Sequence, residues 1–207
     1  ELFTKFKLNI FFSNKLNYNF FPRPHFSTGK TSLFYNENEI SKINNKKIYI
    51  SLKNLFSLSN INISDIIFDG ANFNFNKDNY NFFINILDNN FFNTSLKLIN
   101  SNIFYRNNDN EVLLVNKISE MKYYFDEKIS NNVLYSDNEL FNIPYSIEIF
   151  NDNEKKIIHT KFDINLFRLQ IQNQYSYKGE NKLGFANLLF NNAITSLHDI
   201  SPVFSSS

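Results

Sequence analysis

The 207-residue chain has no cysteine and no tryptophan, and only four glycines, four prolines and one methionine. Without cysteine it can hold no disulfide framework, no thiolate zinc site and no cysteine nucleophile. A net charge of +1 argues against a strongly basic nucleic-acid-binding protein and against an acidic tail protein. The longest uninterrupted apolar run is Val112–Val115, far short of the roughly 18 residues of a membrane-spanning helix, and no secretory signal is visible.

What the chain does contain is asparagine, phenylalanine and isoleucine, at 38, 25 and 24 residues, with 11 tyrosines. Alanine, glycine, proline and arginine, whose codons are GC-rich, total only 14 residues, so an AT-rich genome explains much of the asparagine excess. Aromatic side chains favour strands and bury large areas. A hydrophobic fraction of 43% is close to the globular average, and it predicts a β-rich chain with a sizeable core.

Apolar and polar residues alternate with a period of two along most of the chain, which indicates strands with one buried face. Short segments rich in asparagine and aspartate separate these stretches and suggest tight turns, and Asn36–Asn45 is interpreted as a loop. We predict about ten strands in an antiparallel meander. The predicted strands are 6–12, His25–Tyr35, Lys47–Lys53, Asn60–Asn76, Ser95–Tyr105, Glu111–Phe125, Val133–Leu140, Pro144–Phe150, Lys156–Gln170, Ile171–Tyr177 and Leu183–Leu197.

The stretch Asn60–Asn76 has the clearest pattern. Its apolar residues keep to odd positions across Asp69-Gly70, which favours one long strand with a kink over a hairpin. Asp65 stands on the apolar phase, and a strand bulge that rotates it outward is the favoured explanation. Lys77–Asn90 then changes period, with apolar residues spaced as in one short amphipathic helix.

Strand residues of one phase can share one face of a sheet, and this gives a candidate apolar face. A one-sided sheet needs a cover: either two sheets close on each other, or one curved sheet offers its apolar face to something else. The candidate residues are Ile48, Ile50, Leu52, Ile61, Ile63, Ile67, Phe73, Phe75, Phe162, Ile164 and Leu166.

No catalytic or metal-binding constellation stands out in the sequence. Ser27–Thr31 resembles a phosphate loop, but Pro24 occupies the position of a required glycine and a strand follows instead of a helix. The three histidines, His25, His159 and His198, have no partners at metal-ligand spacing. We therefore expect neither enzymatic activity nor a cofactor or metal, and no nucleic-acid partner.

The segment Phe20–Phe83 resembles the N-terminal region of the AsmA family of bacterial envelope proteins. It begins with Phe20-Phe21-Pro22-Arg23-Pro24-His25-Phe26, and a second strand, Ile48–Leu52, ends at the leucine-rich corner Leu55-Phe56-Ser57-Leu58. A third strand carries Ile66-Ile67-Phe68-Asp69-Gly70-Ala71-Asn72-Phe73, where Ala71 and Asn72 depart mildly from the family phrase. The order of these motifs carries the resemblance, which covers about a third of the chain firmly and most of it loosely.

The resemblance implies a long, taco-shaped β-sheet whose apolar groove contacts phospholipid acyl chains. It further implies a periplasmic location, anchorage in the inner membrane by an N-terminal helix that this chain lacks, and a part in phospholipid transport and outer-membrane assembly without catalysis. We accordingly expect an internal piece of a longer protein: an elongated curved antiparallel sheet with one short helix over residues 1–200, and a frayed polar tail over 201–207.

Two other interpretations remain open from the residues alone. The first is a closed β-sandwich that serves as a surface, adhesion or structural module, with its apolar faces packed on each other and no lipid site. The second is a hydrolase whose acid pair the sequence does not reveal. Whether the odd-position residues of 61–75 line an open groove or a sealed core separates the groove from the sandwich.

Overall fold

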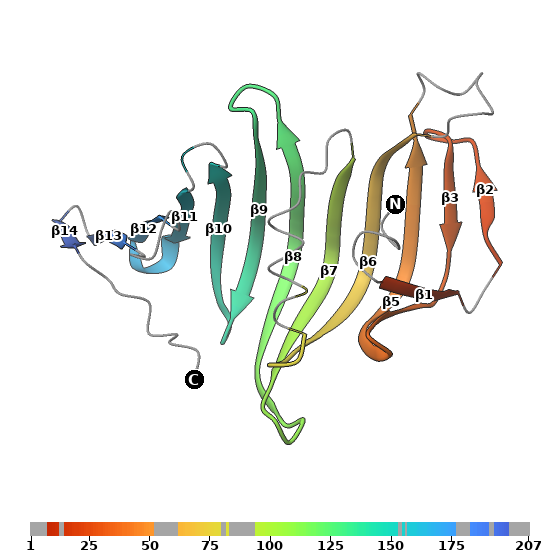
Figure 1. Cartoon of the computed structure of the whole chain (residues 1–207), viewed down its shortest axis with the longest axis horizontal. Helices are drawn as coiled ribbons and strands as arrows, with labels where there is room; N and C mark the ends of the chain where they lie inside the picture. Colours follow the sequence, from red (N-terminus) through yellow and green to blue (C-terminus); the bar gives the residue numbers. More distant parts are fainter. Residues whose placement is uncertain are drawn as a thin grey trace.

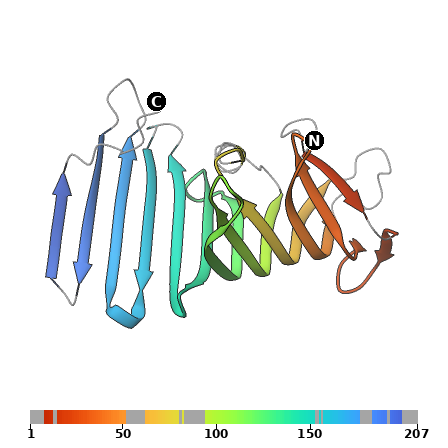
Figure 2. The same ribbon diagram turned by 90° about the horizontal axis from the view of Figure 1, so that it is seen from below.

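The computed structural model describes residues 8–12, 15–51, 62–79, 82, 94–152, 155, 157–176, 183–190 and 193–198. Their strands join into one fourteen-stranded sheet that is curved and unclosed, because the strands at its two ends do not pair with each other. In Figure 1 the strands β5–β10 are seen from the side and β11–β14 nearly end-on, whereas Figure 2 shows β11–β14 from the side. The sheet therefore twists strongly along its length, and the prediction of one elongated curved sheet is confirmed.

The strand bounds agree with most of the predicted stretches. The strands are β1 Leu8–Phe12, β2 Asn17–Asn19, β3 His25–Thr28, β4 Thr31–Tyr35, β5 Asn38–Ile50, β6 Ile63–Phe75, β7 Ser95–Arg106, β8 Val112–Asp126, β9 Asn131–Leu140, β10 Ile143–Asp152, β11 Ile157–Ile164, β12 Leu169–Ser176, β13 Leu183–Phe190 and β14 Ala193–His198. A single 3-10 turn, Asn165–Phe167, connects β11 to β12.

The sheet is mixed, not purely antiparallel as predicted. The pair β6–β7 is parallel, while every other pair among the described strands is antiparallel. A parallel pair requires a crossover connection, because the chain must return to the end at which the first strand began. Here the connection spans residues 76–94, and its Phe82 is 3% exposed within the hydrophobic cluster.

Asn36–Asn45 was predicted as a loop, and this was wrong. The chain turns tightly at Asn36 and Glu37, which have φ of 47° and 66°, and then continues as the thirteen-residue β5. A two-residue turn with two positive φ angles matches the twist of a hairpin, so no longer loop is needed. β3 and β4 both pair with β5, in one register as far as Leu33 and with a shift of one residue between Leu33 and Phe34. They are two parts of the single strand predicted for His25–Tyr35.

Part of the predicted helix Lys77–Asn90 is described. Lys77–Asn79 form a turn in which the Asn76 side-chain oxygen accepts hydrogen bonds from the backbone N–H groups of Asp78 and Asn79. Phe82 is helical, and residues 80–81 and 83–90 lie outside the described residues. The predicted tail, 201–207, also lies outside them.

Four neighbouring strands change side-chain phase at the same level of the sheet. In β6 the buried residues are Ile66 and Phe68 before Gly70, but Ala71 and Phe73 after it. Equivalent shifts occur in β5, β7 and β8, and the register aligns the four positions in one row. The row consists of Asn44, Gly70, Asn100 and Ser119.

Backbone conformation explains this phase change at two of the four positions. Gly70 has φ +67° and Asn100 has φ +48°, values that glycine adopts freely and asparagine tolerates better than most residues. In β8 the extra residue of a bulge, Ser119, has the same effect. The prediction of one continuous strand through Gly70 is confirmed, but the prediction that its odd positions share one face is wrong.

Candidate functional site

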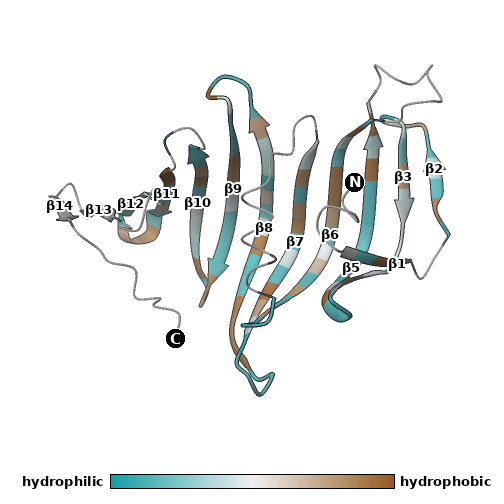
Figure 3. Ribbon diagram, in the orientation of Figure 1, coloured by the Kyte–Doolittle hydropathy of each residue, from teal (hydrophilic) through white to brown (hydrophobic). Residues whose placement is uncertain are grey.

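Cross-strand pairing defines an apolar face that crosses the sheet. Residues directly opposite each other on paired strands lie on the same face, so successive pairs trace a row. The apolar row runs Lys46, Phe68, Leu98, Met121, Ser136, Ile147, Phe162, Ile171 and Leu188, from β5 to β13. Hydrophobic and hydrophilic residues alternate visibly along β6–β10 in Figure 3.

The opposite side of the sheet is the polar face. Its neighbouring row runs Lys47, Ile67, Lys97, Lys122, Tyr135, Glu148, Lys161, Gln172 and Asn187. Ion pairs join adjacent strands on this face, and in one of them the Lys97 Nζ and Glu120 Oε1 atoms lie 2.7 Å apart. The contrast between the rows shows that the sheet is amphipathic over nine strands.

The structure brings most of the candidate residues together on the apolar face. Ile48 pairs with Ile66 of the buried cluster, and Ile50 pairs with Ile63, which packs against that cluster. The candidates on the apolar face are Ile48, Ile50, Ile63, Phe73, Phe75, Phe162 and Ile164.

The remaining candidates do not join this face. Ile67 lies on the polar face between Lys47 and Lys97, because the row through Gly70 reverses the phase of β6. Leu166 lies in the 3-10 turn and is 64% exposed. Leu52 and Ile61 lie outside the described residues.

The apolar face has two zones that differ in burial. The covered zone comprises β4–β8, where side chains form one buried cluster together with Phe82 of the crossover connection. Its members are Leu33, Ile40, Ile43, Ile66, Phe68, Ala71, Phe73, Phe82, Leu98 and Ile118. The open zone comprises β10–β13, where Ile147, Phe162, Ile171 and Leu188 are only half-buried and none belongs to the cluster.

A polar network lies on the apolar face between the two zones. The Asn116 Nδ2 and Ser136 Oγ atoms donate to the Asn138 side-chain Oδ1 at 3.2 and 2.9 Å, and the Tyr145 hydroxyl donates to Asn116 Oδ1 at 3.0 Å. Burial raises the pKa of Tyr145 above its ordinary value, so its hydroxyl, which is protonated at neutral pH, remains a donor in more alkaline solution as well. Sequence reasoning missed this network, because asparagine is too common in the chain for Asn116 and Asn138 to stand out.

Lys46 is the one charged residue of the apolar row, and its side chain is almost wholly buried at 4% exposure. Its Nζ atom lies 5.2 Å from the Phe12 ring centroid and 5.8 Å from that of Phe68. Burial lowers the pKa of Lys46 from its ordinary value to about 8. No carboxylate among the described residues forms an ion pair with it.

Asp65 lies on the polar face, as its predicted bulge requires. The register shifts by one residue between Tyr49 and Ile50, which turns Asp65 away from the cluster. Burial opposes the ionisation of Asp65. The Ser95 and Ser64 hydroxyl groups donate to its carboxylate at 2.6 and 3.0 Å, and the Arg23 guanidinium forms an ion pair with it at 3.1 Å. Together these contacts lower the pKa of Asp65 overall. This corner fastens the segment before β3 to the sheet, because the Arg23 guanidinium also lies over the Tyr49 ring.

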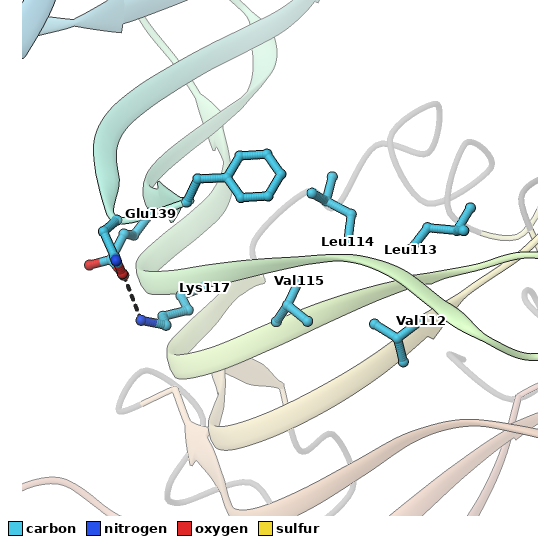
Figure 4. A pocket seen from close by; sticks show the side chains of 8 residues that line it. Val112, Leu113, Leu114, Val115, Lys117 and Glu139 are labelled. Atoms are coloured by element: carbon cyan, nitrogen blue, oxygen red, sulfur yellow. Dashed lines mark hydrogen bonds and ion pairs between the residues drawn. The ribbon is translucent and has the colours of Figure 1, made fainter.

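An open apolar cleft of about 350 Å³ lies where β8 begins, beside the turn between β9 and β10. Val112, Leu113, Leu114 and Val115 line one side, and Lys117 and Glu139 form an ion pair at its rim (Figure 4). Leu113 and Phe141 are 67% and 77% exposed. The cleft can bind apolar groups, but its lining contains no nucleophile paired with a base.

Three findings bear on other kinds of site. Among the described residues, no group of three potential metal ligands comes together. No helix in that part of the chain is long and apolar enough to cross a membrane. His159 stacks on Phe150 at 4.2 Å, and burial lowers the pKa of its imidazole.

The chain matches no protein-family model and no curated protein sequence.

Proposed function

We propose that this chain is a segment of an AsmA-like envelope protein, and that its apolar face binds the acyl chains of phospholipids during their transport to the outer membrane. The proposal rests on two independent supports: the ordered sequence motifs of Phe20–Phe83 and the half-buried apolar residues of the open zone. A lipid chain requires only continuous apolar area, since each methylene removed from water contributes about 0.8 kcal/mol without directional contacts.

The observation that carries the proposal is the half-buried apolar surface of the open zone. From Ile147 on β10 to Leu188 on β13 the row takes three inter-strand steps. At about 4.8 Å a step this spans about 14 Å. The open zone can therefore contact an acyl chain over about this length.

The polar face supports the same function. It keeps one side of a single-layer sheet compatible with water while the other side contacts hydrocarbon. Location at the periplasmic side of the inner membrane, anchorage by an N-terminal helix and absence of catalysis belong to this proposal through the family resemblance alone.

Native mass spectrometry of the purified chain, with lipid extraction, tests the proposal directly. We expect co-purified phospholipid in the wild type. A matched pair of variants then separates lipid contact from folding: Ile171→Asp places a charge on the apolar face, and Gln172→Asp places one on the polar face of the same strand. Ile171→Asp should lose lipid while the sheet persists, because an ion in hydrocarbon is costly. Gln172→Asp should retain both.

Phe73→Asp serves as a separate folding control. Phe73 is 8% exposed within the buried cluster, so an aspartate there should unfold the covered zone. If the wild type carries no lipid and Ile171→Asp changes nothing, the alternative of a structural or surface module without a lipid site is favoured. The described strands make that module a single open sheet, not two packed sheets.

A further inference from the structure

Lys46 lies on β5, where the apolar row begins, among aromatic side chains that are partly exposed. Phe26 of β3 pairs with Ile48, two residues along β5 from Lys46, and Tyr18 of β2 pairs with Phe26. Tyr18 is 52% exposed and Phe12 is 43% exposed, whereas Lys46 itself is 4% exposed. We name Phe12, Tyr18, Phe26 and Ile48 the aromatic edge. An apolar surface reached from solvent therefore adjoins a buried ammonium group.

A buried ammonium group without an anion is costly, because burial removes its hydration. The two ring contacts compensate only in part, since a cation over an aromatic ring gains less than one in an ion pair. On the paired strands, Thr28 and Phe68 stand directly opposite Lys46 on this face. The site thus contains a positive charge, apolar walls and no described carboxylate.

We propose that Lys46 binds the anionic headgroup of an amphiphile whose hydrocarbon chain lies on the aromatic edge. The shared chemistry is a carboxylate or phosphate on an acyl chain. The inference rests on the proposed lipid function and adds to it a position at which the head of the lipid is held. The ammonium supplies the charge, and Phe12, whose partly exposed ring lies 5.2 Å from Lys46 Nζ, has to move aside to admit the headgroup.

The experiment compares two probes with the same oleoyl chain, oleate and 1-monooleoylglycerol, by isothermal titration calorimetry. Wild type should bind oleate more tightly than 1-monooleoylglycerol. Lys46→Met should weaken oleate binding by at least about tenfold, the effect expected for a charge-assisted contact, and leave 1-monooleoylglycerol within about twofold. Lys47→Met alters the neighbouring residue on the polar face and should change neither affinity.

A second arm uses 1-oleoyl-lysophosphatidate to distinguish the two anion sources. Tighter binding than oleate, lost in Lys46→Met, assigns a phosphate headgroup, and the reverse order assigns a carboxylate. The ε-amine NMR signal of Lys46 in the wild type gives an independent measurement that needs no variant: it should shift with oleate and not with 1-monooleoylglycerol.

The results separate the two proposals. Equal binding of all probes, unaffected by Lys46→Met and without an amine shift, overturns the headgroup site and leaves the acyl-binding face standing. Binding of oleate that depends on Lys46, without any binding of 1-monooleoylglycerol, supports the headgroup site and contradicts the acyl-binding face. Failure of all three probes to bind contradicts both.

Discussion

The covered and open zones of the apolar face are built from similar alternating strands but reach different degrees of burial. In the covered zone, β5–β8 are twelve to fifteen residues long and contain bulges or phase changes. In the open zone, β10–β13 are eight to ten residues long, and the pairs β10–β11, β11–β12 and β12–β13 keep a constant register. An alternating pattern therefore yields an amphipathic strand, but not by itself a core.

The crossover connection accounts for part of this difference. The parallel pair β6–β7 requires a crossover connection, and Phe82 of the intervening segment joins the buried cluster. The strand pairs of the open zone are antiparallel and therefore require no crossover connection. Topology, more than composition, separates the two zones.

The largest expected effect compares equivalent isoleucines in the two zones. Ile118→Ala, at a side chain 2% exposed, should lower the free energy of unfolding by about 2–5 kcal/mol through lost burial and a cavity. Ile147→Ala, at a half-buried side chain, should lower it by about 1 kcal/mol. Urea denaturation measures both, and equal losses would show that the open zone is covered in solution.

The next prediction concerns the free-energy cost of burying the Lys46 ammonium group in the covered zone. Its pKa is lowered in the folded state to about 8, so between pH 8 and 10.5 the unfolded chain binds more protons. Stability should therefore rise with pH across that window, by about 3 kcal/mol from this group. The difference in unfolding free energy between Lys46→Met and wild type should shrink over the same window. A difference independent of pH would show that the amine is hydrated.

Gly70→Ala tests the row of phase changes that is confined to the covered zone. The new Cβ atom would lie 2.5 Å from the Asn44 side-chain nitrogen, at a φ of +67°. Clash and backbone strain together should cost about 1–3 kcal/mol. Gly184→Ala, in β13 of the open zone at a φ that is not positive, should be neutral or slightly stabilising. Thermal melts of both variants check the contrast.

The smallest effect compares two aspartates of the polar face, Asp65 on β6 behind the covered zone and Asp163 on β11 behind the open zone. For Asp65 and Asp163 burial favours the neutral form, but hydrogen bonds from Ser95 and Ser64 to Asp65, and from Lys161 and Gln170 to Asp163, lower both pKa values overall. Each aspartate stabilises the fold above its unfolded pKa, and this contribution is lost as the pH falls through the lower folded value. Asp65→Asn should therefore lower the free energy of unfolding at pH 6 more than Asp163→Asn, and both losses should shrink toward pH 3. The order is expected because Asp65 accepts from the Ser95 and Ser64 hydroxyl groups and pairs with Arg23, whereas Asp163 accepts from Gln170 and pairs with Lys161. The urea midpoint measured between pH 6 and pH 3 tests this order.

Much of the fold could be predicted from the sequence because strand alternation is local. The long strand through Gly70 and the outward bulge at Asp65 both follow from residues within a few positions of each other. The loop predicted at Asn36–Asn45 failed because asparagine marks turns only weakly in a chain with 38 of them. Ile67 was predicted on the apolar face but lies on the polar face. The side-chain phase of β6 reverses at Gly70 through its positive φ angle, and the alternation of apolar and polar residues does not reveal that angle.

The sequence by itself determined that the chain forms strands with one apolar side, because the period of two is a property of each strand alone. Only the tertiary structure decided which strands pair, that β6 and β7 run parallel, and that Lys46 lies in an apolar row. Those outcomes depend on the register and direction in which strands far apart in the sequence pair. Burial is a property of the assembled sheet, so the same apolar pattern became a core at Ile118 and a half-exposed surface at Ile147.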